Sequence, residues 1–408
     1  MNTGRPNVLF LLVDCLRADA IGGRGVPTPH LDALIARGGR FTQMIASASS
    51  TTPCVATMLT GVYAPRHGVR SIGAHRLHPD APTLASLLAA AGYHTVAETT
   101  GPLGPESGLD RGFAEYRVRP AAEYLSGDWG RALIARLAGA ALPSPWFLFV
   151  HLWELHAPRK ILPPFRARRF GRTRYDRALA SLDAALAPLL AALPPDTVVL
   201  LHGDHGERLM PSALAYRWYR LRRDILGASR TRKLEGHETD VYEELVRVPL
   251  VVVAPGRVPS GAASAQLVRQ VDVTPTVLDL AGVPAPAGLD GVSLVPALTG
   301  GRTLGLEAFL EACGRVRGTE RDRRRGWRTE RWKLVEAPYA PDVPDELYDL
   351  AADPRERRNL AGSEPELVAS LKARIAAVEA GAAGAAEALS AEEEAAVAAR
   401  LRDLGYIE

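Results

Sequence analysis

The stretch NVLFLLVD, residues 7–14, joins an unbroken run of six apolar residues to an aspartate that follows directly. Such a run is typical of a strand buried on both faces, as in parallel sheets that are covered by helices. The aspartate then lies at the carboxyl end of the strand, where ligands bind in open α/β sheets. The stretch therefore predicts a buried strand that carries Asp14 to a functional edge.

Apolar runs of the same kind alternate with helical patterns along the chain. This alternation predicts an α/β fold with a mostly parallel sheet sandwiched by helices. Beyond about residue 300 the sequence becomes basic and turn-rich, which predicts a small antiparallel subdomain. We expect a catalytic domain over residues 1–300, the C-terminal subdomain over 301–375 and a helical tail over 376–408. Further strands are expected at PWFLFVHLW (145–153), DTVVLLHGD (196–204) and VPLVVVAP (248–255).

The composition is that of an ordinary globular protein of 408 residues, with 47% hydrophobic residues and a net charge of +3. This charge gives no general case for nucleic-acid binding, and the basic run 315–333 is expected to be a solvated face or a local anion site. Three widely spaced cysteines imply no disulfide framework, and the first apolar run is too short for a signal sequence. We therefore expect a cytoplasmic protein. Membrane contact and oligomeric state stay open.

Polar residues gather where the predicted strands end. Asp14 ends the first strand, and Asp204 and His205 follow the strand VVLLHG. Two carboxylates and an imidazole from neighbouring strand ends form a sensible set of ligands for a divalent metal. A polar turn is the alternative for the DHG tripeptide taken alone.

The stretch SASSTTPCVATMLTGVYAPRHGV, residues 47–69, has two interpretations. Serine or threonine before an apolar run, with proline in the first turn, is an ordinary start of a helix. A hydroxyl at a helix N-terminus also feels the positive end of the helix dipole, which suits a nucleophile. Thr51, Thr52 and Cys54 are the candidates, and the stretch alone leaves both interpretations open.

Taken together, these segments resemble the sulfatase branch of the alkaline phosphatase superfamily over nearly the whole chain. The matching segments occur in family order and include NVLFLLVDCLRAD, TTPCVATMLTGVYAPRHGV, HGDHGE, YEELVRVPLVV and ELYDLAADPRERRNLA. The resemblance implies an alkaline-phosphatase-like fold and hydrolysis of an anionic ester. It also implies that Asp14, Thr51, Asp204 and His205 hold a metal, with Glu207 orienting His205 or a helix start.

Two departures from the family pattern bear on the chemistry. Sulfatases carry at the position of Thr51 a cysteine or serine that is oxidised to formylglycine, and an arginine stands where this chain has Val55. Threonine cannot supply that aldehyde, so Thr51 resembles the threonine nucleophile of the superfamily's phosphodiesterases, phosphonate-ester hydrolases and phosphoethanolamine transferases. Thr52 is then structural, and Cys54 is a small buried residue.

The expected activity is therefore that of a hydrolase or transferase acting on phosphoric or phosphonic esters through a covalent phosphothreonine. The substrate would be a small anionic molecule. The alternative is a sulfatase that works without formylglycine. A binding protein without activity is a third reading, but intact Asp14, Asp204 and His205 speak against it.

The second departure is Cys15, which replaces an aspartate that binds calcium in many sulfatases. Loss of a hard oxygen ligand, together with an imidazole in the set, favours Zn²⁺ or Mn²⁺ over Ca²⁺. His156 and His237 follow family positions for substrate contact or acid catalysis. With Glu154 they are also candidates for a second metal site.

The remaining expectations concern histidines and one insertion. His151 and His202 are expected at satisfied core positions, and His67 is expected to fix a loop. Residues 208–236 form a long insertion whose centre, ALAYRWYRLRRDIL (213–226), is basic and aromatic. It is expected to be a lid over an anionic substrate, a membrane-surface helix or a helix docked on the body.

Overall fold

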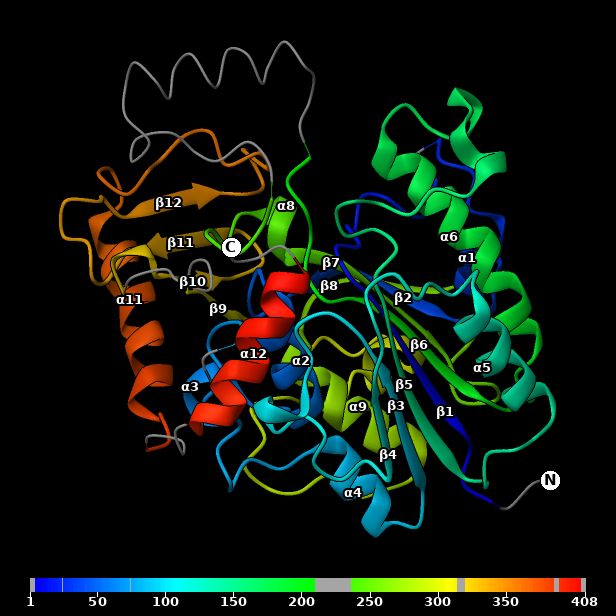
Figure 1. Cartoon of the computed structure of the whole chain (residues 1–408). Coiled ribbons are helices and arrows are strands. Elements are labelled where there is room, and N and C mark those ends of the chain that lie inside the picture. Colours follow the sequence, from blue (N-terminus) through cyan, green and yellow to red (C-terminus); the bar gives the residue numbers. More distant parts are fainter. Residues whose placement is uncertain are drawn as a thin grey trace.

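The computed structural model describes residues 4–23, 25–73, 75–209, 236–313, 320–384 and 389–404. The basic aromatic segment 213–226 lies outside these residues. An eight-stranded sheet with the strand order β4-β3-β5-β1-β6-β7-β2-β8 forms the centre (Figure 1). Strand β7 runs antiparallel to both its neighbours, and the other pairs are parallel. The strands are β1 (Val8–Val13), β2 (Gly39–Ile45), β3 (His94–Thr99), β4 (Glu115–Val118), β5 (Trp146–Leu152), β6 (Val198–Gly203), β7 (Arg247–Val253) and β8 (Ala262–Arg269).

Helices cover both faces of this sheet, which confirms the predicted fold class. Val8, Phe10 and Leu12 face one apolar core, and the alternate residues of β1 face the other. The unbroken apolar run of β1 therefore reflects burial on both faces. One face packs against α2 (Thr51–Thr60), α4 (Leu84–Ala90) and α9 (Val273–Ala281); the other packs against α1 (Pro29–Arg37), α5 (Asp128–Ala138) and α6 (Arg174–Ala191), as Figure 1 shows.

A second sheet, with the order β12-β11-β10-β9, is antiparallel throughout. Its strands are β9 (Ala308–Ala312), β10 (Arg324–Arg328), β11 (Trp332–Glu336) and β12 (Glu346–Asp349). Helix α11 (Pro365–Ala380) packs Leu371 and Ile375 against Phe309 and Leu334 of this sheet. The expected division at 375/376 therefore falls inside a helix that belongs with the second sheet. Short helices α3 (Ala64–His67), α8 (Glu243–Val246) and α10 (Val295–Thr299) and the terminal α12 (Ala391–Asp403) complete the described α-helices.

Several described cations of the basic run in the C-terminal subdomain pair with acids of the chain. Lys333 is fully buried and lies 2.9 Å from Glu356 and 3.3 Å from Glu243. Burial alone would raise the pKa of Glu243, but Lys333 and Arg328 lower it to about 2. Four more ion pairs hold the run: Arg323–Glu311, Arg325–Glu379, Arg328–Glu243 and Arg331–Asp349. These cations therefore tie the second sheet to its surroundings.

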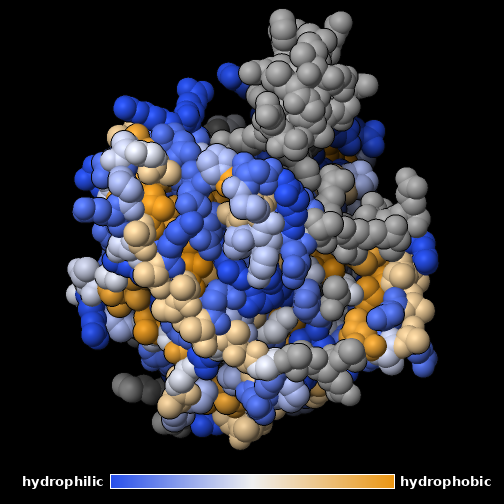
Figure 2. Space-filling view, turned by 90° about the vertical axis from the view of Figure 1, so that its left-hand side faces the viewer, coloured by the Kyte–Doolittle hydropathy of each residue, from blue (hydrophilic) through white to orange (hydrophobic). Residues whose placement is uncertain are grey.

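The outer face of this subdomain mixes hydrophilic and hydrophobic areas (Figure 2). Val292 and Tyr339 are the large apolar side chains that the described residues expose. Within the described part of the chain, no helix has both the length and the apolar character needed to cross a bilayer.

Candidate active site

Strand register brings the polar strand ends together. Leu12 of β1 lies beside His151 of β5 and beside His202 of β6. Side chains two residues apart on a strand share a face, so Asp14 and Asp204 continue the rows of Leu12 and His202. That face is the one covered by α2.

Helix α2 is buried along its whole length, and its first residue faces these carboxylates. Thr51 Oγ1 donates a hydrogen bond to Asp14 Oδ2 at 3.0 Å and lies 3.3 Å from His205 Nε2. The hydroxyl of Thr52 instead donates to the carbonyl of Pro102, and the thiol of Cys54 donates to the carbonyl of Ala48. Of the three candidate nucleophiles, Thr51 is the one directed into the polar cluster.

Asp14, His151 and Asp204 form a fully buried cluster whose ligand atoms all lie within 4.8 Å of one another. Asp14 Oδ1, Asp204 Oδ2 and His151 Nε2 are buried and have no hydrogen-bond partner among the residues that the structure describes. Burial and the charge of Asp14 raise the pKa of Asp204 to about 6. Burial opposes ionisation of Asp14, but nearby imidazoles, His151 foremost, hold its pKa well below the ordinary value. Unpartnered buried carboxylate oxygens are costly, so this cluster has the chemistry of a cation site.

His151 corrects an expectation from the sequence, because it is not a satisfied core residue. Its Nδ1 faces the carbonyl oxygen of Thr100 at 3.1 Å, and its Nε2 lies 3.6 Å from Asp14 Oδ2. The two-residue spacing of Phe149 and His151 puts both side chains on one face of β5, and the pairing of β5 with β1 makes this the face of the Asp14 row. His67 does hold its loop, since the N–H of Val69 donates to its Nδ1.

A second polar cluster lies next to the first and includes Cys15, Glu207 and His237. The thiol of Cys15 donates to Glu207 Oε2 at 3.4 Å, and His237 Nδ1 lies 3.6 Å from the same oxygen. Burial alone would lower the pKa of His237, but Glu207 raises it to about 9. Glu207 therefore contacts His237 and not, as expected, His205, whose Nδ1 faces the carbonyl of Gly206.

Of the residues expected to form a second metal site, His156 and His237 lie side by side, with 5.5 Å between their ring centroids. Glu154 forms no metal-sized cluster with them among the described residues, and its Oε1 accepts a hydrogen bond from the backbone N–H of Leu125. His156 stacks on Trp153 with 4.0 Å between ring centroids, and burial lowers its pKa to about 4. Among the described residues, His237 instead shares a metal-sized cluster with Cys15 and His205.

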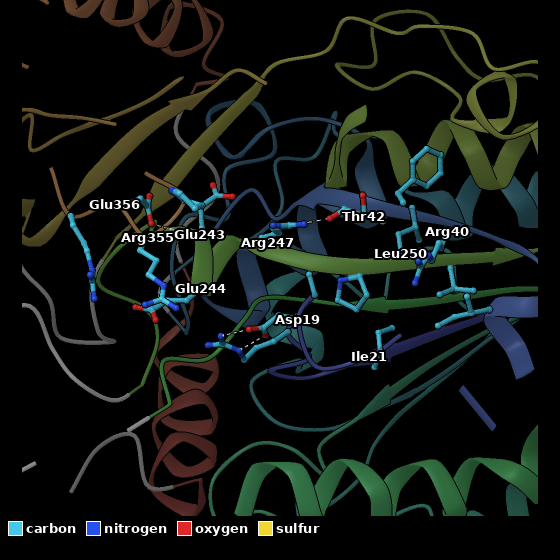
Figure 3. Close-up of a pocket in the computed structure, with 18 residues that line it drawn as sticks. Asp19, Ile21, Arg40, Thr42, Glu243, Glu244, Arg247, Leu250, Arg355 and Glu356 are labelled. Atoms are coloured by element: carbon cyan, nitrogen blue, oxygen red, sulfur yellow. Dashed lines mark hydrogen bonds and ion pairs between the residues drawn. The ribbon is translucent and has the colours of Figure 1, made fainter. Parts of the chain in front are cut away.

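A cavity of about 710 Å³ lies beside β2 and β7 (Figure 3). None of the candidate site residues lines it. Within its wall, Arg17 lies 2.8 Å from Asp19, and Arg247 Nε donates to the carbonyl of Thr42 at 3.0 Å.

The strand ends of the mostly parallel sheet and the buried start of α2 bring carboxylates, imidazoles and a hydroxyl together. This arrangement is that of a metal-assisted ester hydrolase of the alkaline phosphatase superfamily. The sulfatase family model matches residues 6–283, and the model of the N-sulphoglucosamine sulphohydrolase C-terminal region matches residues 238–381. The chain belongs to the sulfatase family. It is a hydrolase that acts on ester bonds, and the family typically binds a divalent metal.

Individual relatives agree with this assignment. Arylsulfatase A of Homo sapiens is 27% identical over 457 aligned positions, which cover 90% of this chain and 86% of that protein. Arylsulfatase K of Danio rerio is 31% identical over 210 positions; this match covers 49% of the chain and only 35% of that relative. The crystal structure of the phosphonate monoester hydrolase of Agrobacterium radiobacter has the same fold, with a TM-score of 0.72 and 22% identity over 92% of this chain and 96% of that one.

Proposed function

We propose that this chain hydrolyses small anionic esters, with Thr51 as the attacking residue and a divalent metal held by Asp14, Asp204, His205 and Thr51. The observation that carries the proposal is the position of Thr51 Oγ1, 3.0 Å from Asp14 Oδ2 and 3.3 Å from His205 Nε2 at a buried helix N-terminus. When bound, a metal there lowers the pKa of a coordinated hydroxyl and offsets the charge of the ester.

The donor set supports Zn²⁺ or Mn²⁺ over Ca²⁺. Ca²⁺ takes six to eight oxygen ligands, whereas this cluster offers imidazole nitrogens from His205 and His151 beside its carboxylates. Cys15, next to Asp14 in sequence, adds a soft sulfur where a hard oxygen would suit calcium. A second metal is not needed for the reaction that follows.

The residues of the chain divide the reaction into two steps. In the first step, the Thr51 hydroxyl gives up its proton on the side of Asp14, Oγ forms a bond to the sulfur or phosphorus atom, and the bond to the leaving oxygen breaks. The leaving oxygen takes up a proton, for which His237 is placed beside Glu207 and His205. In the second step, water breaks the new ester on Thr51, which releases the inorganic acid and restores the hydroxyl.

The acid component of the ester has two candidates. Sulfuric esters are supported by the family and by arylsulfatase A, which is similar along 90% of this chain. Phosphoric and phosphonic esters, the first expectation from the sequence, are supported by the threonine. A threonine sulfate lacks the elimination route open to the formylglycine hydrate, whereas a phosphothreonine can be opened by water at phosphorus. The similarity to sulfatases therefore supports a sulfuric ester as the substrate more directly than the chemistry of threonine supports a phosphoric or phosphonic ester.

Turnover of four p-nitrophenyl esters by the metal-loaded protein tests the proposal and chooses between the acids. The substrates are the sulfate, the phosphate monoester, a phosphodiester and a phosphonate. We expect hydrolysis of at least one of them to depend on Zn²⁺ or Mn²⁺ and to stop after chelation. Equal rates with and without metal, or no turnover of any ester, would contradict the proposed function.

The role of His237 predicts a dependence on the leaving group. In His237→Gln, hydrolysis of a phenyl ester should fall by roughly 100-fold, because general acid catalysis typically contributes that much or more. Hydrolysis of the matching p-nitrophenyl ester should fall far less, since nitrophenolate leaves without a proton. The ratio of kcat values for the two esters is the measurement. Equal losses on both would assign His237 to substrate binding.

A further inference from the structure

A small cavity beside the second polar cluster is lined by four arginines. Its volume is about 360 Å³, and Arg159, Ile161, Arg166, Arg174 and Arg177 form its wall. We call it the arginine pocket. It lies where the chain leaves β5, passes through the short helices η2 (Pro163–Arg166) and η3 (Arg168–Phe170) and enters α6.

Three of the four pocket arginines, Arg166, Arg174 and Arg177, have no ion pair with an acid among the described residues, whereas Arg159 lies 3.8 Å from Glu207. Residues 159–177 contain eight arginines and lysines and a single acid, Asp176. Asp176 is committed to the start of α6, where its carboxylate accepts from the N–H of Thr173 and its own N–H donates to the Thr173 hydroxyl. Arg177 donates to the backbone carbonyls of Gly171 and Arg172, which position the guanidinium but leave its charge in place.

The first turn of α6 makes this arrangement costly without an anion. Arg174 and Arg177 lie at the N-terminal end of an 18-residue helix. Helix N-termini carry a partial positive charge, so cations are disfavoured there and anions are stabilised. Two arginines at this end, beside two more in the wall of the cavity, therefore destabilise the protein. A bound oxyanion would offset this cost.

Arg159 connects the arginine pocket to the second polar cluster. Its side chain is 11% exposed, and Nη2 lies 3.8 Å from Glu207 Oε2, the oxygen that also contacts His237. Its Nε is buried with no hydrogen-bond partner in the described part of the chain. Successive contacts therefore lead from Thr51 through His205, His237 and Glu207 to Arg159 and the pocket.

We propose that the arginine pocket binds a second anionic group of the substrate, a sulfate, phosphate or carboxylate separate from the ester that is hydrolysed. This inference rests on the proposed function, because the first anionic group is the ester at Thr51. Arginine forks bind such groups through paired, charge-assisted hydrogen bonds. The substrate class is then a multiply charged molecule, and a singly charged aryl ester uses only part of the site.

Calorimetric binding of unreactive sulfonates tests the pocket without requiring turnover. The probes are naphthalene-2-sulfonate and the 2,6- and 2,7-disulfonates, titrated into the full-length, metal-loaded protein. We expect one disulfonate to bind about tenfold more tightly than the monosulfonate, a typical gain from one added charge-assisted contact. In Arg166→Gln/Arg174→Gln/Arg177→Gln this ratio should fall to about one.

A matched control lies on the same segment. Arg168→Gln/Arg169→Gln/Arg172→Gln removes the same charge from residues that do not line the pocket, and it should keep the native ratio. If the first triple variant unfolds at a lower temperature, the single exposed change Arg166→Gln replaces it and should still lower the ratio. A ratio near one in the native protein, or equal loss in both triple variants, would overturn the inference.

Free inorganic sulfate distinguishes a group on the substrate from a separate anion. Sulfate added to the monosulfonate complex should not reproduce the affinity of the disulfonate. If it does, the pocket takes a free anion and the assignment to the substrate is wrong. Failure of the proposed function would be seen separately, as absent ester hydrolysis with the disulfonate preference intact.

Discussion

Thr51→Val should lower kcat on every ester that the enzyme hydrolyses by roughly three orders of magnitude or more, the scale of losing a nucleophile. Valine keeps the branched shape of threonine at the fully buried start of α2 and removes only the hydroxyl. The loss should be in kcat, because Thr51 forms its bond to sulfur or phosphorus only during reaction. Rapid quenching of the native enzyme should show the mass of the acid group added to the peptide that contains Thr51.

Thr52→Val is the matched control for this change. Thr52 is equally buried, but its hydroxyl donates to the carbonyl of Pro102 at 3.1 Å and does not face the carboxylates. Its loss should cost about 1 kcal/mol of stability, the typical value of one hydrogen bond, with kcat within a few-fold of the native value. Turnover by Thr51→Val at the native rate would exclude a covalent intermediate on Thr51.

Asp204→Asn should remove metal and activity together. Asp204 is fully buried, and its Oδ2 has no hydrogen-bond partner in the described structure, so its charge is available to a cation. Asparagine keeps the shape but removes that charge, and we expect metal affinity to fall by roughly 100-fold or more, beyond the loss seen for outer contacts. Metal content by mass spectrometry and kcat/KM on the same sample are the measurements.

Asp183→Asn provides the control for removing a buried carboxylate. Asp183 lies in α6 and accepts hydrogen bonds from the backbone N–H groups of His30 and Leu31 at the start of α1. Its replacement should lower the melting temperature and leave the metal content unchanged. A full equivalent of metal in Asp204→Asn would place the metal site elsewhere. Excess metal that restores Asp204→Asn but not Thr51→Val would separate metal binding from nucleophilic attack.

Much of the fold could be predicted because the local pattern of apolar residues indicates which strands are buried. The run of residues 8–13 has no polar residue, so both its faces had to be covered, and the confirmed helices on the two sides of the sheet follow from that. The motif order also named Asp14, Thr51, Asp204 and His205, which the structure places next to one another. Their roles in catalysis stay predictions that the variants above test.

Local sequence could not supply the partners of the remaining site residues, because those depend on how distant segments pack. Glu207 was expected to orient His205, two residues away, or a helix start, yet the chain returns thirty residues later and presents His237 to it. Glu154 was grouped with His156 and His237 as a candidate second metal site, but its Oε1 accepts a hydrogen bond from the backbone N–H of Leu125, which belongs to another segment.

The sequence by itself determined the type of fold, the family and the strand ends at which the chemistry occurs, since these follow from hydrophobic periodicity and motif order. Only the tertiary structure decided that His151 joins the buried carboxylates and that Arg159 connects the second polar cluster to the arginine pocket. The physical reason is that strand register and helix packing fix the direction of each side chain, and both are set by contacts between residues far apart in the chain.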